Sequence, residues 1–251
     1  MIEIRNDYLF ELSWSKVTKF NDFINIKPKG KGVYLWIMEL NNDYYPYYVG
    51  TSCAEGEYSI HKRQLRHFNN LMKNKGNLFN MSNLISDRKD LYECINEYSI
   101  DYNKRNKLSL KQETKYFICN DAYKNELKNY DIKNRIVEIA NHNIENTFIT
   151  YVDCSDPRFN YKKYESLDII QKNREINYLT ELLEGIIIKY IKNKFKLEFY
   201  SSSNSILGKI QRAEFKKPTG FLIENIVSEK DNKYFSKFGN EFVLFKDDID
   251  Y

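Results

Sequence analysis

The sequence predicts an α/β fold in which a small antiparallel sheet of three strands is flanked by helices. Three observations lead to this prediction. Residues 33–40 and 44–49 are β-prone runs joined by turn-forming residues, which is typical of a β-hairpin. Residues 147–153 form a third β-prone run. Residues 173–194 repeat apolar side chains at helical spacing, and a helix this apolar is expected to pack against the sheet.

The composition indicates a folded protein with few flexible linkers. Of the 251 residues, 42% are hydrophobic, and only 9 are glycine and 4 proline, which excludes an intrinsically disordered chain. A net charge of +4 permits a polyanionic partner without requiring one. The four cysteines include no CxxC pair, so neither a zinc site nor a disulfide framework is expected.

The sequence carries no sign of a membrane segment. Apolar runs fall short of the roughly 20 residues that a span needs, and the first residues, MIEIRNDYLF, lack the pattern of a signal peptide. We therefore expect a soluble, cytoplasmic protein with no membrane partner.

We interpret residues 1–251 as a single domain whose core is interrupted once. The core covers about residues 30–72 and 147–205, which hold the hairpin, the third strand and the helices. Residues 73–146 are polar and rich in asparagine and lysine, so we interpret them as an inserted subdomain. Residues 206–251 form a C-terminal elaboration.

Further elements are expected in these additions and in the hairpin itself. In the insertion we expect a strand at 115–119 and a helix around 131–141. Two C-terminal strands, near 220–226 and 241–245, either complete the sheet or form a small cap. Pro46 has no amide hydrogen for a strand ladder, so the second strand of the hairpin should contain an unpaired stretch or a bulge.

Residues 59–72 follow a helical period with two contrasting faces. Arg63 and His67 are one turn apart, so their side chains project from the same cationic face. The opposite face is apolar and is expected to dock on the core. This apolar face consists of Leu65, Phe68 and Met72.

Two tripeptides in the hairpin resemble the paired signature of the GIY-YIG nucleases. Gly32-Val33-Tyr34 precedes Tyr48-Val49-Gly50, with valine in place of isoleucine in both halves. Valine and isoleucine are interchangeable as strand formers. Either tyrosine alone would be an ordinary strand residue, but both tripeptides in order within one hairpin should arise by chance in roughly one chain in a thousand.

Residues downstream extend the resemblance. Family members place an arginine on the next helix, often with a histidine one turn later, and a metal-binding glutamate on a distant helix. Arg63 and His67 match the first two and resemble the restriction-enzyme branch. Glu184 and Glu181 are the candidates for the glutamate. Glu184 lies on the edge of the apolar arc of its helix and is preferred, whereas Glu181 is expected to point into water.

The resemblance also implies an asparagine after this helix, for which Asn204 is the first candidate and Asn193 the second. The implied cofactor is one Mg²⁺ ion per active site held by Glu184, with Mn²⁺ as an alternative. Arg63 would bind the phosphate with its forked donors.

The remaining side chains of the site would handle protons. Tyr34 would help to deprotonate the attacking water, because the neighbouring Arg63 favours its phenolate. Tyr48 would orient the water or Tyr34. His67 would either relay a proton or contact a phosphate.

The function implied is a metal-dependent DNA endonuclease that hydrolyses phosphodiester bonds. The Arg63 and His67 pair favours a sequence-specific, restriction-type enzyme that cuts both strands of DNA. One metal site per chain is consistent with a homodimer. Repair and mobile-element nucleases of the same family are alternatives, as is a catalytically inactive DNA-binding or interaction protein on this scaffold.

Overall fold

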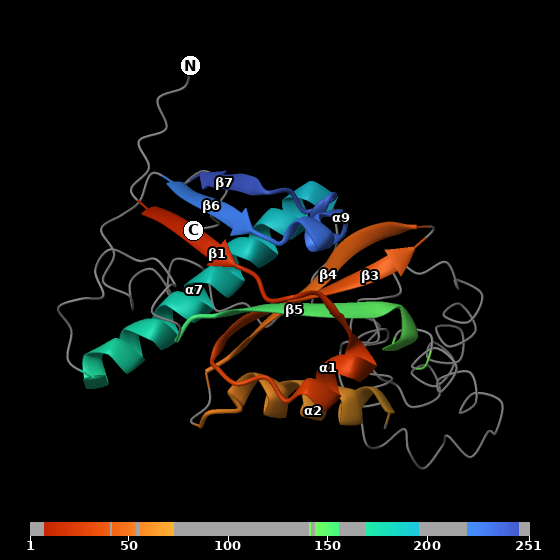
Figure 1. The fold of residues 1–251 in the computed structure, drawn as a ribbon. Coiled ribbons are helices and arrows are strands. Elements are labelled where there is room, and N and C mark those ends of the chain that lie inside the picture. Colours follow the sequence, from red (N-terminus) through yellow and green to blue (C-terminus); the bar gives the residue numbers. More distant parts are fainter. Residues whose placement is uncertain are drawn as a thin grey trace, which may run out of the picture.

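Two β-sheets make up the fold, and the strands of each come from distant parts of the sequence (Figure 1). The computed structural model describes residues 8–40, 42–53, 56–72, 141, 144–155, 169–195 and 220–245. The α/β class predicted from the sequence is confirmed.

The first sheet contains the predicted hairpin and has four strands in the order β2-β5-β3-β4. Its strands are antiparallel: β2 (Thr18–Lys19), β3 (Gly32–Leu40), β4 (Asp43–Ser52) and β5 (Thr147–Asp153). The three predicted strands are confirmed, but the expected number of three is wrong because β2 pairs with β5. A two-residue strand has no periodic pattern that a sequence could reveal.

The hairpin contains the irregularity that Pro46 predicts. Trp36 pairs with Tyr48, but the next residue, Ile37, pairs with Pro46, so Tyr47 is the extra residue of a β-bulge. Beyond the bulge, Tyr45 pairs with Met38. Since the partners of Tyr45 and Tyr48 are two residues apart on β3, both tyrosines face the same side of the sheet.

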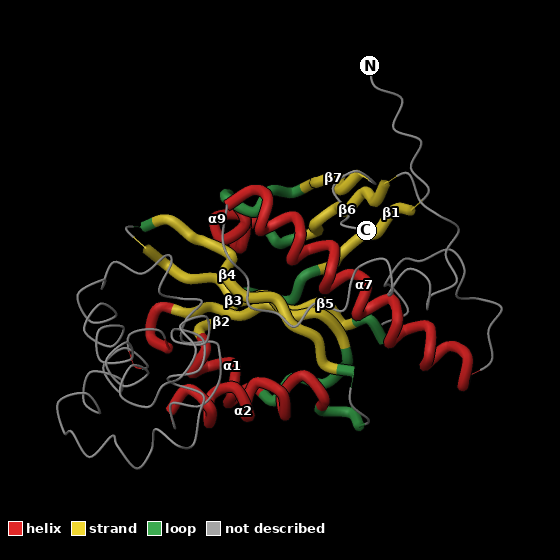
Figure 2. The backbone as a smooth tube through the Cα atoms, turned by 180° about the vertical axis from the view of Figure 1, so that it is seen from behind, coloured by secondary structure: helices red, strands yellow, loops and turns green. Residues whose placement is uncertain are grey.

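Helices cover both faces of this sheet (Figures 1 and 2). On one side lie α1 (Phe20–Ile26) and α2 (Ser59–Met72), and on the other lies α7 (Ile169–Phe195). The long helix contacts both β3 and β4, as expected for its apolar face. Its fully buried apolar side chains, among those that the structure describes, are Leu179, Leu182, Leu183, Ile186, Ile187 and Ile191.

The orientation of α2 differs from the prediction. Ile60, Gln64 and His67 are among the buried residues of this helix, as are Ser59 and His61 in its first turn, while Leu65 is only half-buried. Phe68 does pack on the core, where its ring stacks on Phe20. The face of the helix that packs on the sheet therefore includes polar side chains. The prediction that an apolar face packs on the core while a cationic face points outward is wrong.

The second sheet has three strands in the order β1-β6-β7. They are β1 (Tyr8–Ser13), β6 (Gly220–Ile226) and β7 (Glu241–Phe245), with β1 parallel to β6 and β7 antiparallel to it. Both C-terminal strands have the predicted bounds. They do not complete the first sheet, because their ladder partner is an N-terminal strand far away in sequence.

A short connection between β6 and β7 ties the second sheet to α7. It contains η4 (Glu229–Asp231) and α9 (Asn232–Phe235). The Tyr190 ring of α7 stacks on Phe242 at 3.9 Å between ring centroids, and its hydroxyl donates to the Phe238 carbonyl at 2.6 Å. One helix thus contributes to the hydrophobic cores of both sheets.

The segment that follows β1 joins the two sheets. Trp14 Nε1 donates to Asn225 Oδ1 at 2.8 Å, and Asn225 Nδ2 donates to the Gly239 carbonyl at 2.9 Å. The next residue, Ser15, donates its backbone amide to the Tyr151 carbonyl of β5 at 2.8 Å. Within a few residues the chain passes from one sheet to the other.

The strand expected at 115–119 lies outside the described residues, as does nearly all of the expected helix at 131–141. None of the helices that the structure does describe combines the length and apolar character needed to cross a membrane.

We expect Asn225→Ala to lower the free energy of unfolding by about 1–3 kcal/mol, because it leaves buried hydrogen-bonding groups of Trp14 and Gly239 without this partner. Urea denaturation measures the change. Asn240→Ala is the control, since that side chain is exposed and its loss should change stability by less than about 0.5 kcal/mol. Equal effects of the two substitutions would contradict the assigned role of Asn225.

Candidate active site

Gly32 and Gly50, the glycines of the two signature tripeptides, stand where neighbouring atoms leave no room for a Cβ atom. Gly50 pairs with Tyr34 across the hairpin, and a Cβ at position 50 would overlap the Tyr34 phenol. A Cβ at Gly32 would overlap the Val152 carbonyl oxygen of β5. The glycine at 50 therefore makes room for the Tyr34 ring, which is completely buried.

Tyr34 forms a short hydrogen bond with His67. Their Oη and Nε2 atoms are 2.7 Å apart, and the imidazole lies among the rings of Tyr34, Trp36 and Tyr48. Burial, and then the charge of Arg63, lowers the pKa of His67 to about 3. The imidazole is therefore neutral near pH 7 and can accept the Tyr34 hydroxyl proton. With 6% of its surface exposed, His67 is poorly placed for the phosphate contact considered from the sequence.

Arg63 reaches the same phenol from one turn earlier on α2. Its Nε donates to Tyr34 Oη at 3.4 Å, and the side chain is half-buried. Burial raises the pKa of Tyr34 well above its usual value, and the neighbouring Tyr48 adds to the rise. The charge of Arg63 opposes this rise without overcoming it. The expectation that Arg63 makes a phenolate favourable at Tyr34 is therefore wrong for the protein without substrate.

Tyr48 is the signature tyrosine with access to solvent. It is half-buried, and its hydroxyl lies 3.5 Å from that of Tyr34. Burial raises the pKa of Tyr48, while the hydrogen bond to Tyr34 and the charge of Arg63 oppose the rise. Hydrogen-bonding groups therefore follow one another from the buried imidazole of His67, through Tyr34, to the more accessible phenol of Tyr48.

Glu184 approaches this cluster from the other face of the sheet. Thr51, which follows Gly50 on β4, donates its hydroxyl to Glu184 Oε2 at 3.5 Å. The Glu184 charge also raises the pKa of Tyr48, so the carboxylate and the phenol interact electrostatically. Because β4 is the edge strand of its sheet, Glu184 and Tyr48 are brought together around that edge.

Glu181 does not point into water as the sequence suggested. The residue is half-buried and one of its carboxylate oxygens is covered. Both Glu181 and Glu184 oppose ionisation of the Cys53 thiol, whose pKa burial raises to about 11. Glu181 and Glu184, on consecutive turns of α7, thus both place a carboxylate near the end of β4. Glu184 is the one with a hydrogen bond from Thr51.

Of the two asparagine candidates, only Asn193 is described, and it lies away from the cluster. Asn204 lies outside the described residues. Asn193 is exposed near the end of α7, nine residues and therefore about 13.5 Å along the helix axis from Glu184.

Glu184 has the chemistry to hold a Mg²⁺ ion. This cation prefers oxygen ligands, keeps several water molecules, and commonly takes only one or two protein carboxylates together with substrate phosphates. Within the described ranges, no group of three or more His, Cys, Asp or Glu side chains could hold a metal by itself. Phosphate and water oxygens would have to complete the coordination shell.

Gln64 and Trp36 are members of the site that sequence reasoning missed. Trp36 Nε1 donates to Gln64 Oε1 at 3.0 Å, and both side chains are buried. This bond fixes α2 over β3 at the level of His67. Ile60, Gln64 and His67 are spaced so that they lie on one face of a helix, and this spacing could have indicated a buried face. Because Gln64 and His67 are polar, the sequence instead favoured the face formed by Leu65, Phe68 and Met72.

Comparison of the chain with protein-family models, with curated proteins and with solved structures found no match. The chemistry of the site is therefore inferred from its own side chains and their geometry.

The buried imidazole should make stability depend on pH. The pKa of His67 is about 3 in the folded chain, whereas an imidazole exposed to water in the unfolded chain has the ordinary value of 6.5. Between these two pH values the unfolded chain therefore binds a proton that the folded chain does not. Stability is then complete above about pH 6.5 and falls by up to about 1.4 kcal/mol for each pH unit below it. Urea denaturation between pH 7 and pH 5, expressed as a difference between wild type and His67→Gln, isolates this contribution; equal pH dependence would contradict the assignment.

Proposed function

We propose that this chain is a metal-dependent DNA endonuclease of the GIY-YIG type. The observation that carries the proposal is the contact of Tyr34 with Tyr48, Arg63 and His67 directly over Gly50. The two signature tyrosines thus lie together with the arginine and the histidine expected downstream. Purely structural tyrosines would not require a charged guanidinium beside the buried phenol of Tyr34, because desolvation makes that arrangement costly.

The hydrogen bonds suggest a path for the proton of the attacking water. Tyr48 would accept this proton while passing its own to Tyr34, which passes its own to Nε2 of His67. The water oxygen would form the new bond to phosphorus as the bond to the 3′ oxygen breaks. The two phenols thus end the step neutral, and the imidazole gains the proton.

Substrate binding would make His67 a better proton acceptor. In the protein alone, burial and the Arg63 charge disfavour the imidazolium. A phosphodiester bound by Arg63 brings a negative charge that compensates this cation, so the proton affinity of His67 rises. The relay would therefore become active when DNA is in place.

The chemistry that a bound Mg²⁺ ion supplies is stabilisation of negative charge on the phosphate oxygens and the leaving group. Glu184 is the residue that would hold it. Within nucleases, we favour a restriction-type enzyme that cuts double-stranded DNA, because Arg63 and His67 occupy adjacent turns and both contact Tyr34.

We expect Mg²⁺-dependent cleavage of genomic DNA, which offers many sequences at once. Glu184→Ala should abolish cutting, while Glu181→Ala should retain it because Glu184 is the carboxylate proposed to hold the ion, and it accepts the hydrogen bond of Thr51 beside Gly50. Arg63→Ala should reduce the rate about 100-fold to 1,000-fold, whereas exposed Arg66→Ala is the matched control. Gel analysis of the fragments measures the rates. A wild-type protein that binds DNA but never cuts it would contradict the proposed nuclease activity.

The proton path predicts a separation of activity from stability. Tyr34→Phe removes the link between His67 and Tyr48, so cleavage should fall about 100-fold to 10,000-fold. Tyr47→Phe is the control, because it removes another buried hydroxyl that forms a 2.8 Å hydrogen bond with Thr147. Each variant should lose about 1 kcal/mol of stability, but only Tyr34→Phe should lose activity. If both variants cut like wild type, the relay is wrong.

A further inference from the structure

Two exposed lysines flank the edge of the hairpin, close to the solvent-accessible end of the site. Lys233 belongs to α9, and Lys237 follows one turn later. The ammonium group of Lys233 lies 4.8 Å from the Tyr234 ring centroid and 5.5 Å from that of Tyr44. The ammonium group of Lys237 lies 5.6 Å from the Tyr45 ring centroid. We refer to Lys233 and Lys237 as the lysine patch.

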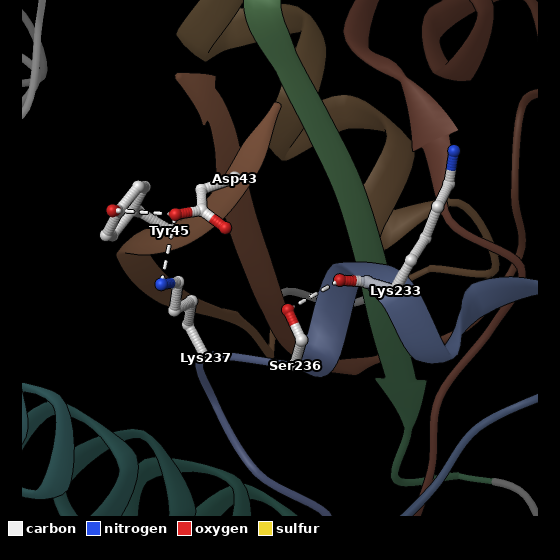
Figure 3. A network of polar contacts seen from close by, with 5 residues as sticks. All are labelled: Asp43, Tyr45, Lys233, Ser236 and Lys237. Carbon is white, nitrogen blue, oxygen red and sulfur yellow. Dashed lines mark hydrogen bonds and ion pairs between the residues drawn. The ribbon is translucent and has the colours of Figure 1, made fainter. Parts of the chain in front are cut away.

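A single short turn holds both lysines in place (Figure 3). Lys237 forms an ion pair of 3.0 Å with Asp43, which also accepts a hydrogen bond from the Tyr45 hydroxyl. The figure shows Lys237 reaching towards Asp43 and Tyr45, while Lys233 leaves the turn in another direction. The fully buried rings of Phe235, between the two lysines, and of Phe238, directly after Lys237, anchor the turn in the core.

The ammonium groups keep donors for a further ligand. A lysine has three N–H donors, and the contact with Asp43 occupies only part of those of Lys237. The Tyr44 and Tyr234 hydroxyls also hydrogen-bond the Lys233 ammonium group, but these partners are neutral and do not cancel its charge. Glu39 and Asp43 are the acids among the described contacts of the patch, and Glu39 accepts a hydrogen bond from the Tyr44 hydroxyl. The patch therefore offers two oriented cations with donors directed outwards.

The position of the patch relates it to the candidate active site. Tyr45, beneath Lys237, faces the same side of the hairpin as Tyr48, and their β3 partners are two residues apart. This separation is about 7 Å along the strand, or roughly two base steps of DNA. A nucleic-acid strand running along the β4 edge would pass both Tyr48 and the lysine patch.

We propose that the lysine patch binds the DNA backbone beside the scissile phosphate, an inference that rests on the proposed nuclease function. Lys237 contacts a phosphate on the side of the hairpin that carries Tyr48, and Lys233 contacts a second phosphate on the side that carries Tyr44. Such contacts position the substrate without reading its sequence, because lysine acts as a point charge towards phosphate. Because the turn is anchored in the core, binding DNA would cost little conformational entropy at these lysines.

Salt dependence of DNA binding tests the patch directly. Fluorescence anisotropy of a labelled duplex, measured in EDTA to prevent metal-assisted cutting, gives the dissociation constant between about 50 and about 200 mM salt. For the double variant Lys233→Gln/Lys237→Gln, the slope of log affinity against log salt should decrease in magnitude by about 1.8, which corresponds to two lost phosphate contacts. Thermal unfolding confirms that the variant is folded.

A second double variant removes the same charge elsewhere. Lys16→Gln/Lys230→Gln eliminates two exposed lysines outside the patch and should keep the wild-type slope. With Mg²⁺ added, the patch variant should show a raised KM and an unchanged kcat, since neither lysine takes part in the proton path.

The outcomes separate the two proposals. If wild type binds and cuts DNA but the patch variant keeps its slope and KM, the patch is not a DNA contact and the nuclease proposal stands. If both double variants lose slope equally, the contacts are diffuse and the patch proposal fails. If wild type binds no duplex at all, the nuclease proposal fails together with the patch.

Discussion

The hydrogen bond between Tyr34 and His67 is the interaction on which the candidate site depends. Both groups are buried, and this bond satisfies Nε2 of His67 while it gives Tyr34 the shortest of its hydrogen bonds. The Tyr34 ring fits only because its cross-strand partner is Gly50, where any Cβ would overlap the phenol. A constraint on backbone volume in β4 therefore determines where the hydroxyl lies and, through it, the positions of Arg63 and Tyr48 relative to each other.

Burial gives these groups properties that they would lack in water. The imidazole of His67 is neutral and the phenols hold their protons more tightly than free tyrosine. Arg63 keeps its charge beside them because two phenol oxygens interact with it. The result is a site with one fixed cation and several uncharged proton carriers, which is suited to receive an anion and then to move a proton.

Helices on opposite faces of the four-stranded sheet bring these residues together. The bond between Trp36 and Gln64 fixes α2 below β3, so that Arg63 and His67 face the hairpin. On the other face, α7 packs on β3 and β4 and turns Glu184 towards Thr51. Because β4 lies at the edge of the sheet, groups from the two faces can meet around it, and Lys237 contacts Asp43 and Tyr45 of the same strand.

Much of the fold could be predicted from local pattern. The hairpin with its bulge near Pro46, the strand at 147–153 and the C-terminal strands follow from β-prone runs and turn residues. The long helix follows from its apolar repeat. The parallel pairing of β1 with β6 could not be predicted, because their partnership joins opposite ends of the chain and neither strand encodes it locally.

For the site, the sequence by itself determined which residue types stand in the signature and in what order, since tripeptides and helical spacing are local properties. Only the tertiary structure decided which faces they occupy. A helical wheel ranks side chains by polarity, but α2 docks with His67 and Gln64 inward because Tyr34 and Trp36 offer them hydrogen bonds. In the same way, Glu181 is half-buried and interacts with the Cys53 thiol just after β4, and the pKa of Tyr34 is raised because burial outweighs the charge of Arg63. These outcomes depend on desolvation and on partners distant in sequence, which no local pattern records.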